Sequence, residues 1–354
     1  MTTIRIGIVG LGRLGFIHAS NIAFSLKKAT LSAVCSLSQD ELNHAARELF
    51  LPESSCYSDF KTMLASGKID AVIIASSSAH HCDQVVLALE AGLHVFCEKP
   101  MGTTVKECHT IEGAVNKYKD RIFMLGYMRR YDASYRYAKE KIEAGDIGKP
   151  VLFRGYSVDP SHAMEGFLNF LPNSGGQFLD MAVHDIDMAR WLLKSEPRTI
   201  YAMGGSFAFP QFADHRDGDN VAALMQFEND AMVFLLAGRT ASHGYNVETE
   251  IIGTRATLRI GSVPQKNLVE ILDSSGVRQE CTQCFSERFE HAFIAELQEF
   301  VDCILEQRKP EITAYDGTRA TEIAVLATES FRENKLIHLT EAVPIDSDGM
   351  IVES

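Results

Sequence analysis

The chain has 354 residues, 46% of them hydrophobic and 23% charged, and this length and composition predict a globular protein with two domains. Acidic residues (47) outnumber basic residues (34), and the net charge of −13 argues against nucleic acid or an anionic membrane surface as a partner, though not against a small anionic ligand. No apolar run reaches the roughly 18 residues that a membrane span needs.

The first residues and the cysteines predict a cytoplasmic protein. The sequence MTTIRIGIVG begins directly in a strand pattern and lacks the layout of a signal peptide. Eight scattered cysteines fit reduced thiols. Cys281 and Cys284 form a lone CTQC pair without the second pair or the nearby histidines of a zinc site, so we expect no metal there.

The first strand pattern runs into a glycine-rich turn and then a helical pattern, in the stretch IRIGIVGLGRLGFIHASNIA. This context makes the motif a predicted dinucleotide site. Gly10 permits the tight turn, Gly12 lets the backbone approach a pyrophosphate, and Gly15 lets helix and strand pack closely. Arg13 and Leu14 complete the turn, where the helix N-terminus offers N–H groups to phosphates. The alternative is a glycine-rich turn that binds no ligand.

Strand and helix patterns alternate through the first third of the chain, which predicts a parallel, doubly wound α/β sheet of the Rossmann type in residues 1–126. Ligands of such sheets bind beyond the carboxyl ends of the strands. Further residues expected at that edge, for the cofactor, are Ala75, Ser76, His80, Glu98 and Lys99. Lys99 precedes Pro100, which restricts its backbone and favours a fixed side chain.

The residue after the second strand bears on the choice of cofactor. An acidic residue there normally binds the adenosine ribose hydroxyls and selects NAD. This sequence has Ser36, which can bond a hydroxyl but does not repel a 2′-phosphate. No Arg or Lys follows before the next helix to attract that phosphate. We therefore expect NAD, with NADP as the alternative.

The stretch GGQFLDMAVHDIDMARWLL, residues 175–193, predicts an amphipathic helix with an unusual polar side. Asp180, His184, Asp187 and Trp191 fall on one stripe, and Asp185 lies away from it. The stripe could be a solvated face, a metal site or acid–base machinery. A metal site needs three or more converging ligands, whereas only Asp180 and His184 share the face well.

A nicotinamide dinucleotide accepts hydride, and if the hydride comes from an alcohol carbon, the reaction also needs a base poised near neutral pH. Histidine is the natural base, so we assign that role to His184. Asp180 would fix its tautomer or accept a bond from a substrate hydroxyl. Lys99 would place positive charge beside the developing alkoxide, and would repel a metal ion delivered to the same place.

Beyond the helix of residues 131–145, six strand patterns predict an α+β domain over residues 127–345, with a large, open and mostly antiparallel sheet. The strand patterns NVAALMQF and AMVFLLAG are apolar enough to indicate a sheet covered on both faces. A partner subunit could cover the second face. The alternative is that the helices of residues 286–305 and from Tyr315 onward cover it within one chain.

Four motifs together, GLGRLG, HVFCEKP, GYMRRYDASY and DMAVHDID, resemble the Gfo/Idh/MocA oxidoreductases over nearly the whole chain. Within that family the sequence is most similar to the inositol 2-dehydrogenases of Gram-positive bacteria. The resemblance implies NAD-dependent oxidation of a ring hydroxyl of myo- or scyllo-inositol to an inosose. It also implies that Lys99, Asp180 and His184 are catalytic, and that homodimers or homotetramers form through the second sheet.

Further roles follow from the resemblance alone. It implies that Arg129 and Asp159 contact the polyol, that His80 lies near the nicotinamide, and that the loop with His243 and Tyr245 approaches the substrate. The sequence departs from the family at Ser36, at residues 76–78 (SSS, where relatives often have prolines) and in a longer segment between Asp159 and Asp180. Two alternatives stay open, the same chemistry on an aldose or sugar derivative, and a non-catalytic dinucleotide-binding sensor.

Overall fold

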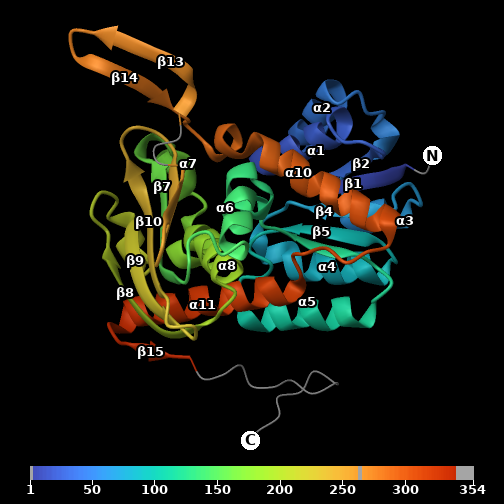
Figure 1. The fold of residues 1–354 in the computed structure, drawn as a ribbon. Coiled ribbons are helices and arrows are strands. Elements are labelled where there is room, and N and C mark those ends of the chain that lie inside the picture. The colour runs from blue at the N-terminus through green and yellow to red at the C-terminus, as the bar shows by residue number, and fades with distance from the viewer. Residues whose placement is uncertain (1–2, 262–264, 340–354) are drawn as a thin grey trace, which may run out of the picture. The chain divides into compact units, whose positions relative to one another are not determined.

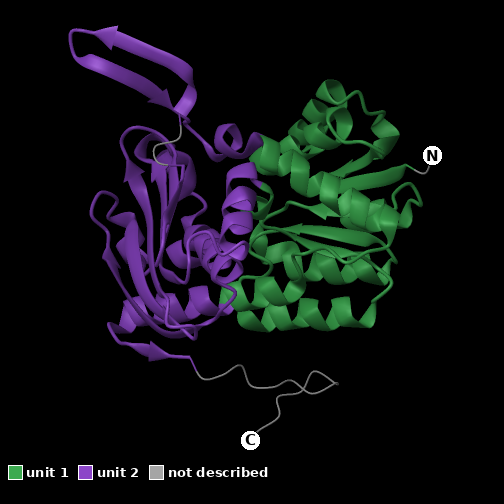
Figure 2. Ribbon diagram, viewed as in Figure 1, with its two compact units in different colours: residues 1–131, 291–321 green, residues 132–290, 322–354 purple. Residues whose placement is uncertain are grey.

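The computed structural model describes residues 3–261 and 265–339. The chain forms two compact units (Figure 2). Unit 1 contains Met1–Tyr131 and His291–Thr321, and unit 2 contains Asp132–Glu290 and Glu322–Ser354. None of the helices in the described ranges is both long and apolar enough to cross a membrane.

Unit 1 is built on a six-stranded sheet with the order β3-β2-β1-β4-β5-β6 (Figure 1). All neighbouring strands pair in parallel. The predicted doubly wound sheet is therefore confirmed, in the strand order typical of dinucleotide-binding folds. The strands are β1 (Ile4–Val9), β2 (Ala29–Cys35), β3 (Cys56–Tyr57), β4 (Ala71–Ile74), β5 (His94–Glu98) and β6 (Phe123–Gly126).

Helices cover both faces of this sheet. On one face, α1 and α10 pack over an apolar core that includes Ile6, Ile8 and Phe96, and on the other α4 and α5 lie side by side (Figure 1). The helices of unit 1 are α1 (Arg13–Phe24), α2 (Gln39–Glu48), α3 (Phe60–Ala65), α4 (His81–Glu90) and α5 (Val105–Lys117), the short η1 (Glu53–Ser55), η2 (Ser78–His80) and η3 (Met128–Tyr131), and parts of α10 (Phe285–Glu306) and α11 (Ala314–Glu333).

The division of the chain differs from the predicted one, which placed all of residues 127–345 in the second domain. His291–Thr321 returns to unit 1, because α10 buries its apolar side in the core of the first sheet. Four of its side chains, Leu297, Phe300, Val301 and Ile304, belong to that core. This part of α10 therefore covers the first sheet rather than the second one.

Unit 2 contains a seven-stranded sheet with the order β12-β11-β7-β10-β9-β8-β15. Only β7 and β10 pair in parallel, so the predicted mostly antiparallel sheet is confirmed. Residues 246–260 form two of these strands, joined by a turn. The strands are β7 (Pro150–Pro160), β8 (Pro197–Gly205), β9 (Asn220–Phe227), β10 (Met232–Ala241), β11 (Asn246–Gly253), β12 (Thr257–Ile260) and β15 (Ile337–His338).

The remaining elements of unit 2 are a hairpin and several helices. A separate two-stranded hairpin consists of β13 (Gln265–Asp273) and β14 (Gly276–Cys281). The helices are α6 (Ala133–Glu143), α7 (Met164–Leu168), α8 (Val183–Leu193), α9 (Gln211–Asp214) and the parts of α10 and α11 outside residues 291–321, with the single turns η4 (Ser161–Ala163), η5 (Leu171–Asn173) and η6 (Phe178–Ala182). Because α8 contacts β7 and β10, it covers one face of the sheet.

Candidate active site

The glycine turn between β1 and α1 has the shape that a dinucleotide needs. A Cβ added at Gly10, whose φ is +87°, would lie 2.5 Å from Ser76 N, and one at Gly15 would lie 1.9 Å from Gly10 O. Both glycines are therefore required by close backbone packing. Gly12 has open space where its Cβ would be, and no side chain caps the first turn of α1. These features fit a pyrophosphate at the helix N-terminus.

The other predicted cofactor residues of unit 1 follow the strand ends. Gly10 N donates to Cys35 O, and Ala75 N donates to Val9 O, both over 2.9 Å, which ties the ends of β1, β2 and β4 together. Ser76 Oγ donates to Gln84 Oε1 over 2.6 Å. The exposed His80 ends η2. The structure therefore gathers Gly10–Gly15, Ala75 and Ser76 at one sheet edge.

His81, which the sequence analysis passed over, is the buried histidine of this edge. Its Nδ1 lies 2.8 Å from Pro100 O and its Nε2 lies 3.1 Å from Ser76 O. Burial lowers the pKa of His81 below its ordinary value. The neutral ring therefore joins the loop after β4 to the loop after β5, next to Lys99.

Lys99 is fixed through its backbone by the residue before it. Glu98 Oε1 accepts a hydrogen bond from His18 Nε2 over 2.6 Å, and Glu98 Oε2 accepts one from Lys99 N over 3.2 Å. The Lys99–Pro100 peptide is cis. Glu98 is 5% exposed, so its carboxylate makes these two hydrogen bonds in the buried interior. A direct contact between Glu98 and the cofactor stays a prediction.

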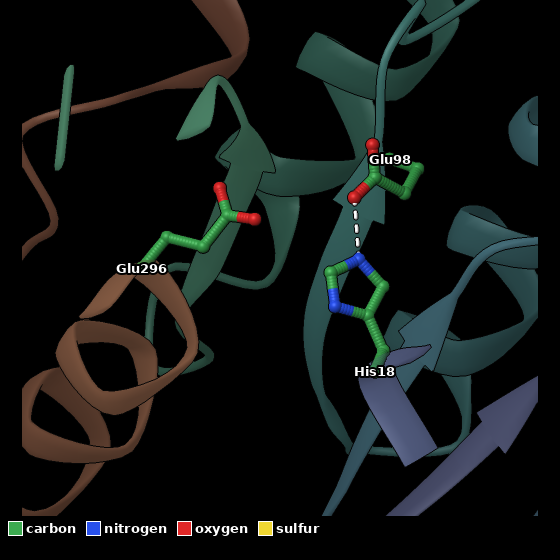
Figure 3. A group of neighbouring side chains, drawn as sticks. All are labelled: His18, Glu98 and Glu296. Carbon is green, nitrogen blue, oxygen red and sulfur yellow. Dashed lines mark hydrogen bonds and ion pairs between the residues drawn. The ribbon is translucent and has the colours of Figure 1, made fainter. Parts of the chain in front are cut away.

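A third acid completes a buried cluster with this pair (Figure 3). Glu296 on α10 points its carboxyl group toward Glu98 and His18, and ligand atoms of the three residues lie within 4.8 Å of one another. Neither Glu296 oxygen has a hydrogen-bond partner among the described residues. Burial and the charge of Glu98 raise the pKa of Glu296 well above its ordinary value, so the fold favours the neutral form of this acid.

The geometry of this cluster is that of hydrogen bonding. His18 Nε2 and Glu98 Oε1 lie 2.6 Å apart. Two ligand atoms that each bind a metal ion at about 2.0–2.2 Å in a tetrahedral arrangement must lie farther apart than this. The His18 ring also meets the rings of Phe96 and Phe293 edge-on, at centroid distances of 5.8 and 5.7 Å. The cluster is therefore a buried group of three ionisable side chains, next to the loop of Lys99.

In unit 2, Arg239 joins two of the predicted site residues. From β10, its Nη1 donates to Asp159 and its Nη2 donates to Asp180, while its Nε donates to Gln177 Oε1 over 3.0 Å. The guanidinium also lies 3.8 Å from the centroid of the Phe167 ring. The Arg239 side chain is 3% exposed, against 26% for Asp159 and 17% for Asp180. One buried cation thus holds two carboxylates that solvent can still reach.

The helix of Asp180 and His184 differs from the predicted amphipathic one. Residues Phe178–Ala182 form a π-helical turn, so Asp180 and His184 do not follow the spacing of a regular α-helix. All of α8 is buried, including Asp185 and Asp187 at 1% and 0% exposure. The predicted amphipathic character is therefore wrong. Of the three alternatives for the polar stripe, a solvated face is excluded, because α8 packs against the sheet, where Ser157 of β7 donates to Asp185.

The remaining predicted substrate residues have different environments. Arg129 is 1% exposed in η3 of unit 1, and His243 is exposed in the loop before β11. Tyr245 is 7% exposed and packs edge-on against Phe289 at a centroid distance of 6.4 Å. Tyr245 is therefore part of the packed interior of unit 2, which the sequence did not indicate.

Besides His81 and the buried cluster, two further residues of this geometry were not predicted from the sequence. Arg239 directly precedes the loop TASHGYNVE, and its position at the end of an apolar strand was the available signal. Glu41 accepts a hydrogen bond from Ser36 Oγ over 2.5 Å and supplies an acid near the end of β2. The two residues are five positions apart, so a motif confined to the strand end does not include Glu41.

Each unit contains residue types that alcohol oxidation needs. The dinucleotide turn and Lys99 lie in unit 1, and Asp159, Asp180 and His184 lie in unit 2. Carboxylates held by a guanidinium accept hydrogen bonds from hydroxyl groups. A lysine offers positive charge and a histidine accepts a proton near neutral pH.

Known families match both units. Residues 4–127 match the oxidoreductase family with the NAD-binding Rossmann fold. Residues 135–259 match the GFO/IDH/MocA C-terminal domain. Both matches agree with the fold of the respective unit.

Similar individual proteins are inositol dehydrogenases. The chain is 33% identical to the scyllo-inositol 2-dehydrogenase (NAD(+)) of Bacillus subtilis, over 95% of this chain and 96% of that protein. It is 44% identical to the scyllo-inositol dehydrogenase from Lactobacillus casei solved with NAD(H) and scyllo-inositol, with a TM-score of 0.91 over 95% of this chain and 99% of that one.

A third relative has the same architecture. The myo-inositol 2-dehydrogenase from Lactobacillus plantarum is 37% identical, with a TM-score of 0.93 over 96% of this chain and 100% of that one. Because these likenesses extend over nearly the full length and both family regions occur in order, the chain belongs to the Gfo/Idh/MocA family of oxidoreductases.

Proposed function

We propose that this protein is an NAD-dependent dehydrogenase that oxidises a ring hydroxyl of myo- or scyllo-inositol to the corresponding inosose. The observation that carries the proposal is the pair of carboxylates, Asp159 and Asp180, held side by side on Arg239. A polyol presents several hydroxyl donors at once, and such a pair matches them better than it matches an anion. The names of the similar proteins point to the same substrate class.

Catalysis in this proposal uses three side chains. His184 accepts the proton of the reacting hydroxyl, and Asp180 orients that hydroxyl or the imidazole. Lys99 stabilises the negative charge that develops on the oxygen as the proton leaves. Bound NAD+ supplies the acceptor for the hydride from the ring carbon, so the products are a ketone, NADH and one proton.

The cofactor would be held by unit 1. Gly12 and the first turn of α1 would take the pyrophosphate, and the loops after β2, β4 and β5 would take the remaining parts. The proposed cofactor residues are Gly10, Gly12, Arg13, Leu14, Gly15, Ser36, Ala75, Ser76, His80, Glu98 and Lys99. The proposed further contacts of the polyol are Arg129, Asp159, His243 and Tyr245.

Steady-state reduction of NAD+ and NADP+ with myo-inositol, scyllo-inositol and glucose tests this function. We expect turnover of an inositol with NAD+. In His184→Ala the turnover should decrease by about 10²-fold or more, which is within the range that loss of a general base costs. Activity on glucose but on neither inositol would identify the substrate as an aldose and leave the assignment of the site residues unchanged. Cofactor binding without turnover of any polyol would favour a sensor.

We also propose a cytoplasmic homodimer or homotetramer that associates through the sheet of unit 2. In the alternating strands, Met203 of β8, Leu224 of β9 and Met232 of β10 lie on one face of the sheet and are 58%, 55% and 46% exposed. A second copy would bury these apolar side chains. The cytoplasmic location is supported by the free thiols of all eight cysteines.

A further inference from the structure

The end of β2 lies beside the glycine turn. Gly10 N donates to Cys35 O, the last residue of β2, and Ser36 follows directly. Ser36 N in turn donates to Tyr57 O of β3 over 3.1 Å. In a dinucleotide-binding sheet, the residue at this place meets the adenosine ribose. The side chains around Ser36 therefore decide whether the 2′ position of that ribose can carry a phosphate.

The hydroxyl of Ser36 is already engaged. Its Oγ donates to Glu41 Oε2 over 2.5 Å and accepts a hydrogen bond from Ser38 N over 3.0 Å. A serine hydroxyl has a single proton to donate. Ser36 therefore acts mainly as a support for the Glu41 carboxylate, and is not the principal recognition group at this edge.

Glu41 is held in place from two sides. It lies in the first turn of α2, where Glu41 N donates to Ser38 Oγ over 3.3 Å in the N-terminal cap. Its side chain is tied to Ser36, while its Oε1 receives no hydrogen bond from any described residue. Glu41 as a residue is half-buried, so this oxygen, near the end of β2, is available to a ligand.

The basic groups of α2 do not neutralise this carboxylate. Arg47 bonds Glu48 Oε1 over 2.8 Å and lies near His44 Nδ1, and the His44 ring stacks on Phe16 at 4.6 Å. Asp40 adds a second acid to the first turn. A 2′-phosphate placed here would meet like charge, whereas a free 2′-hydroxyl would find an acceptor.

We infer that Glu41, positioned by Ser36, binds the adenosine ribose hydroxyls and excludes the 2′-phosphate, so that this chain selects NAD over NADP with an acid from α2 rather than from the end of β2. The inference rests on the proposed dinucleotide-dependent function and assigns its cofactor specificity to one side chain. It also explains how a chain with serine at position 36 can discriminate against NADP.

Binding of NADH and NADPH to the full-length protein, followed by nicotinamide fluorescence, tests the inference without any substrate. In Glu41→Gln we expect weaker NADH binding and tighter NADPH binding. The ratio of the Kd for NADPH to the Kd for NADH should therefore fall by about tenfold or more, as expected when a charged hydrogen-bond acceptor is lost. In Glu41→Lys the preference should reverse, and the NADPH affinity should decrease with salt.

Glu48→Gln is the matched control, because Glu48 lies on the same helix and bonds Arg47 instead. It should leave the ratio unchanged. Ser36→Ala should lower the ratio less than Glu41→Gln, since the carboxylate remains but loses its support. An unchanged ratio in both Glu41 variants would overturn the inference, as would a wild-type protein that does not prefer NADH.

The same assay separates this inference from the proposed function. A ratio that shifts as expected, in a protein that oxidises no inositol, would support the role of Glu41 and reject the substrate. Failure of the wild-type protein to bind either dinucleotide would overturn both.

Discussion

Arg239 donates a hydrogen bond to Asp180 from a position that is almost completely buried. The same guanidinium bonds Asp159 and Gln177, which leaves Asp180 little freedom to rotate. The planar fork of an arginine makes this triple contact possible, and a lysine offers only a point charge.

Arg239→Lys should therefore lower kcat/KM for the polyol by about 10², because a small misplacement of a catalytic group costs that much, while NADH binding should remain near wild type. The measurements are steady-state kinetics and NADH fluorescence titration. Arg216→Gln is the control, since Arg216 forms an exposed ion pair with Glu333. Wild-type kinetics in Arg239→Lys would contradict the positioning role.

Glu296 predicts an unusual dependence of stability on pH. Its pKa in the folded protein is raised well above 4.5, so the folded state keeps a proton that the unfolded chain releases. This residue therefore contributes a free energy of unfolding that falls as pH rises from about 4.5 to the raised pKa, by up to about 1.4 kcal/mol per pH unit. Glu296→Gln removes this contribution.

Denaturant unfolding at pH 5 and pH 8 measures the effect. We expect Glu296→Gln to lose less stability than the wild type between these pH values, and to be at least as stable at pH 8. Glu299→Gln is the matched control on the same helix, where Glu299 bonds Arg308. A Glu296→Gln variant much less stable than the wild type at pH 8 would mean that Glu296 is charged.

The glycine turn predicts opposite defects for two neighbouring substitutions. Gly12→Ala should fold normally, because its Cβ meets nothing within 4 Å, but should weaken NADH binding by filling the place of the pyrophosphate. Gly15→Ala should be strongly destabilised, since its Cβ would lie 1.9 Å from Gly10 O. Thermal unfolding and NADH titration distinguish the two, and equal stability of both variants would contradict the packing.

The apolar face of the second sheet predicts a change in assembly. The double variant Leu224→Lys and Met232→Lys should dissociate the oligomer, because two charges would be buried at the contact. Light scattering after size-exclusion chromatography gives the mass. Phe24→Lys is the control, since Phe24 is 63% exposed in unit 1. A wild-type protein that is already monomeric would refute the proposed association.

Local patterns were sufficient for much of the fold. The alternation of strands and helices predicted the first sheet, because each element there buries an apolar run of its own. The glycine spacing predicted the turn at Gly10–Gly15, since both the turn and the helix start are encoded within a few residues. The strand patterns after residue 149 likewise predicted the second sheet.

Contacts between distant residues were beyond these patterns. Arg239 lies 59 positions from Asp180 in the sequence, so nothing local links them. The residue pattern of α8 predicted an amphipathic helix, but the whole helix is buried, and Asp185 has its partner, Ser157, on another element. The π-helical turn at Phe178–Ala182 also breaks the regular spacing from which the helical wheel was drawn.

The path of the chain has a practical consequence for fragments of this protein. Three chain crossings, after Tyr131, Glu290 and Thr321, join the two units. A fragment that ends at Tyr131 would lack Leu297, Phe300, Val301 and Ile304, and would leave part of its sheet uncovered. Such a fragment should aggregate. A soluble dinucleotide-binding half would instead require residues 291–321 to be grafted onto Tyr131 through a short artificial linker.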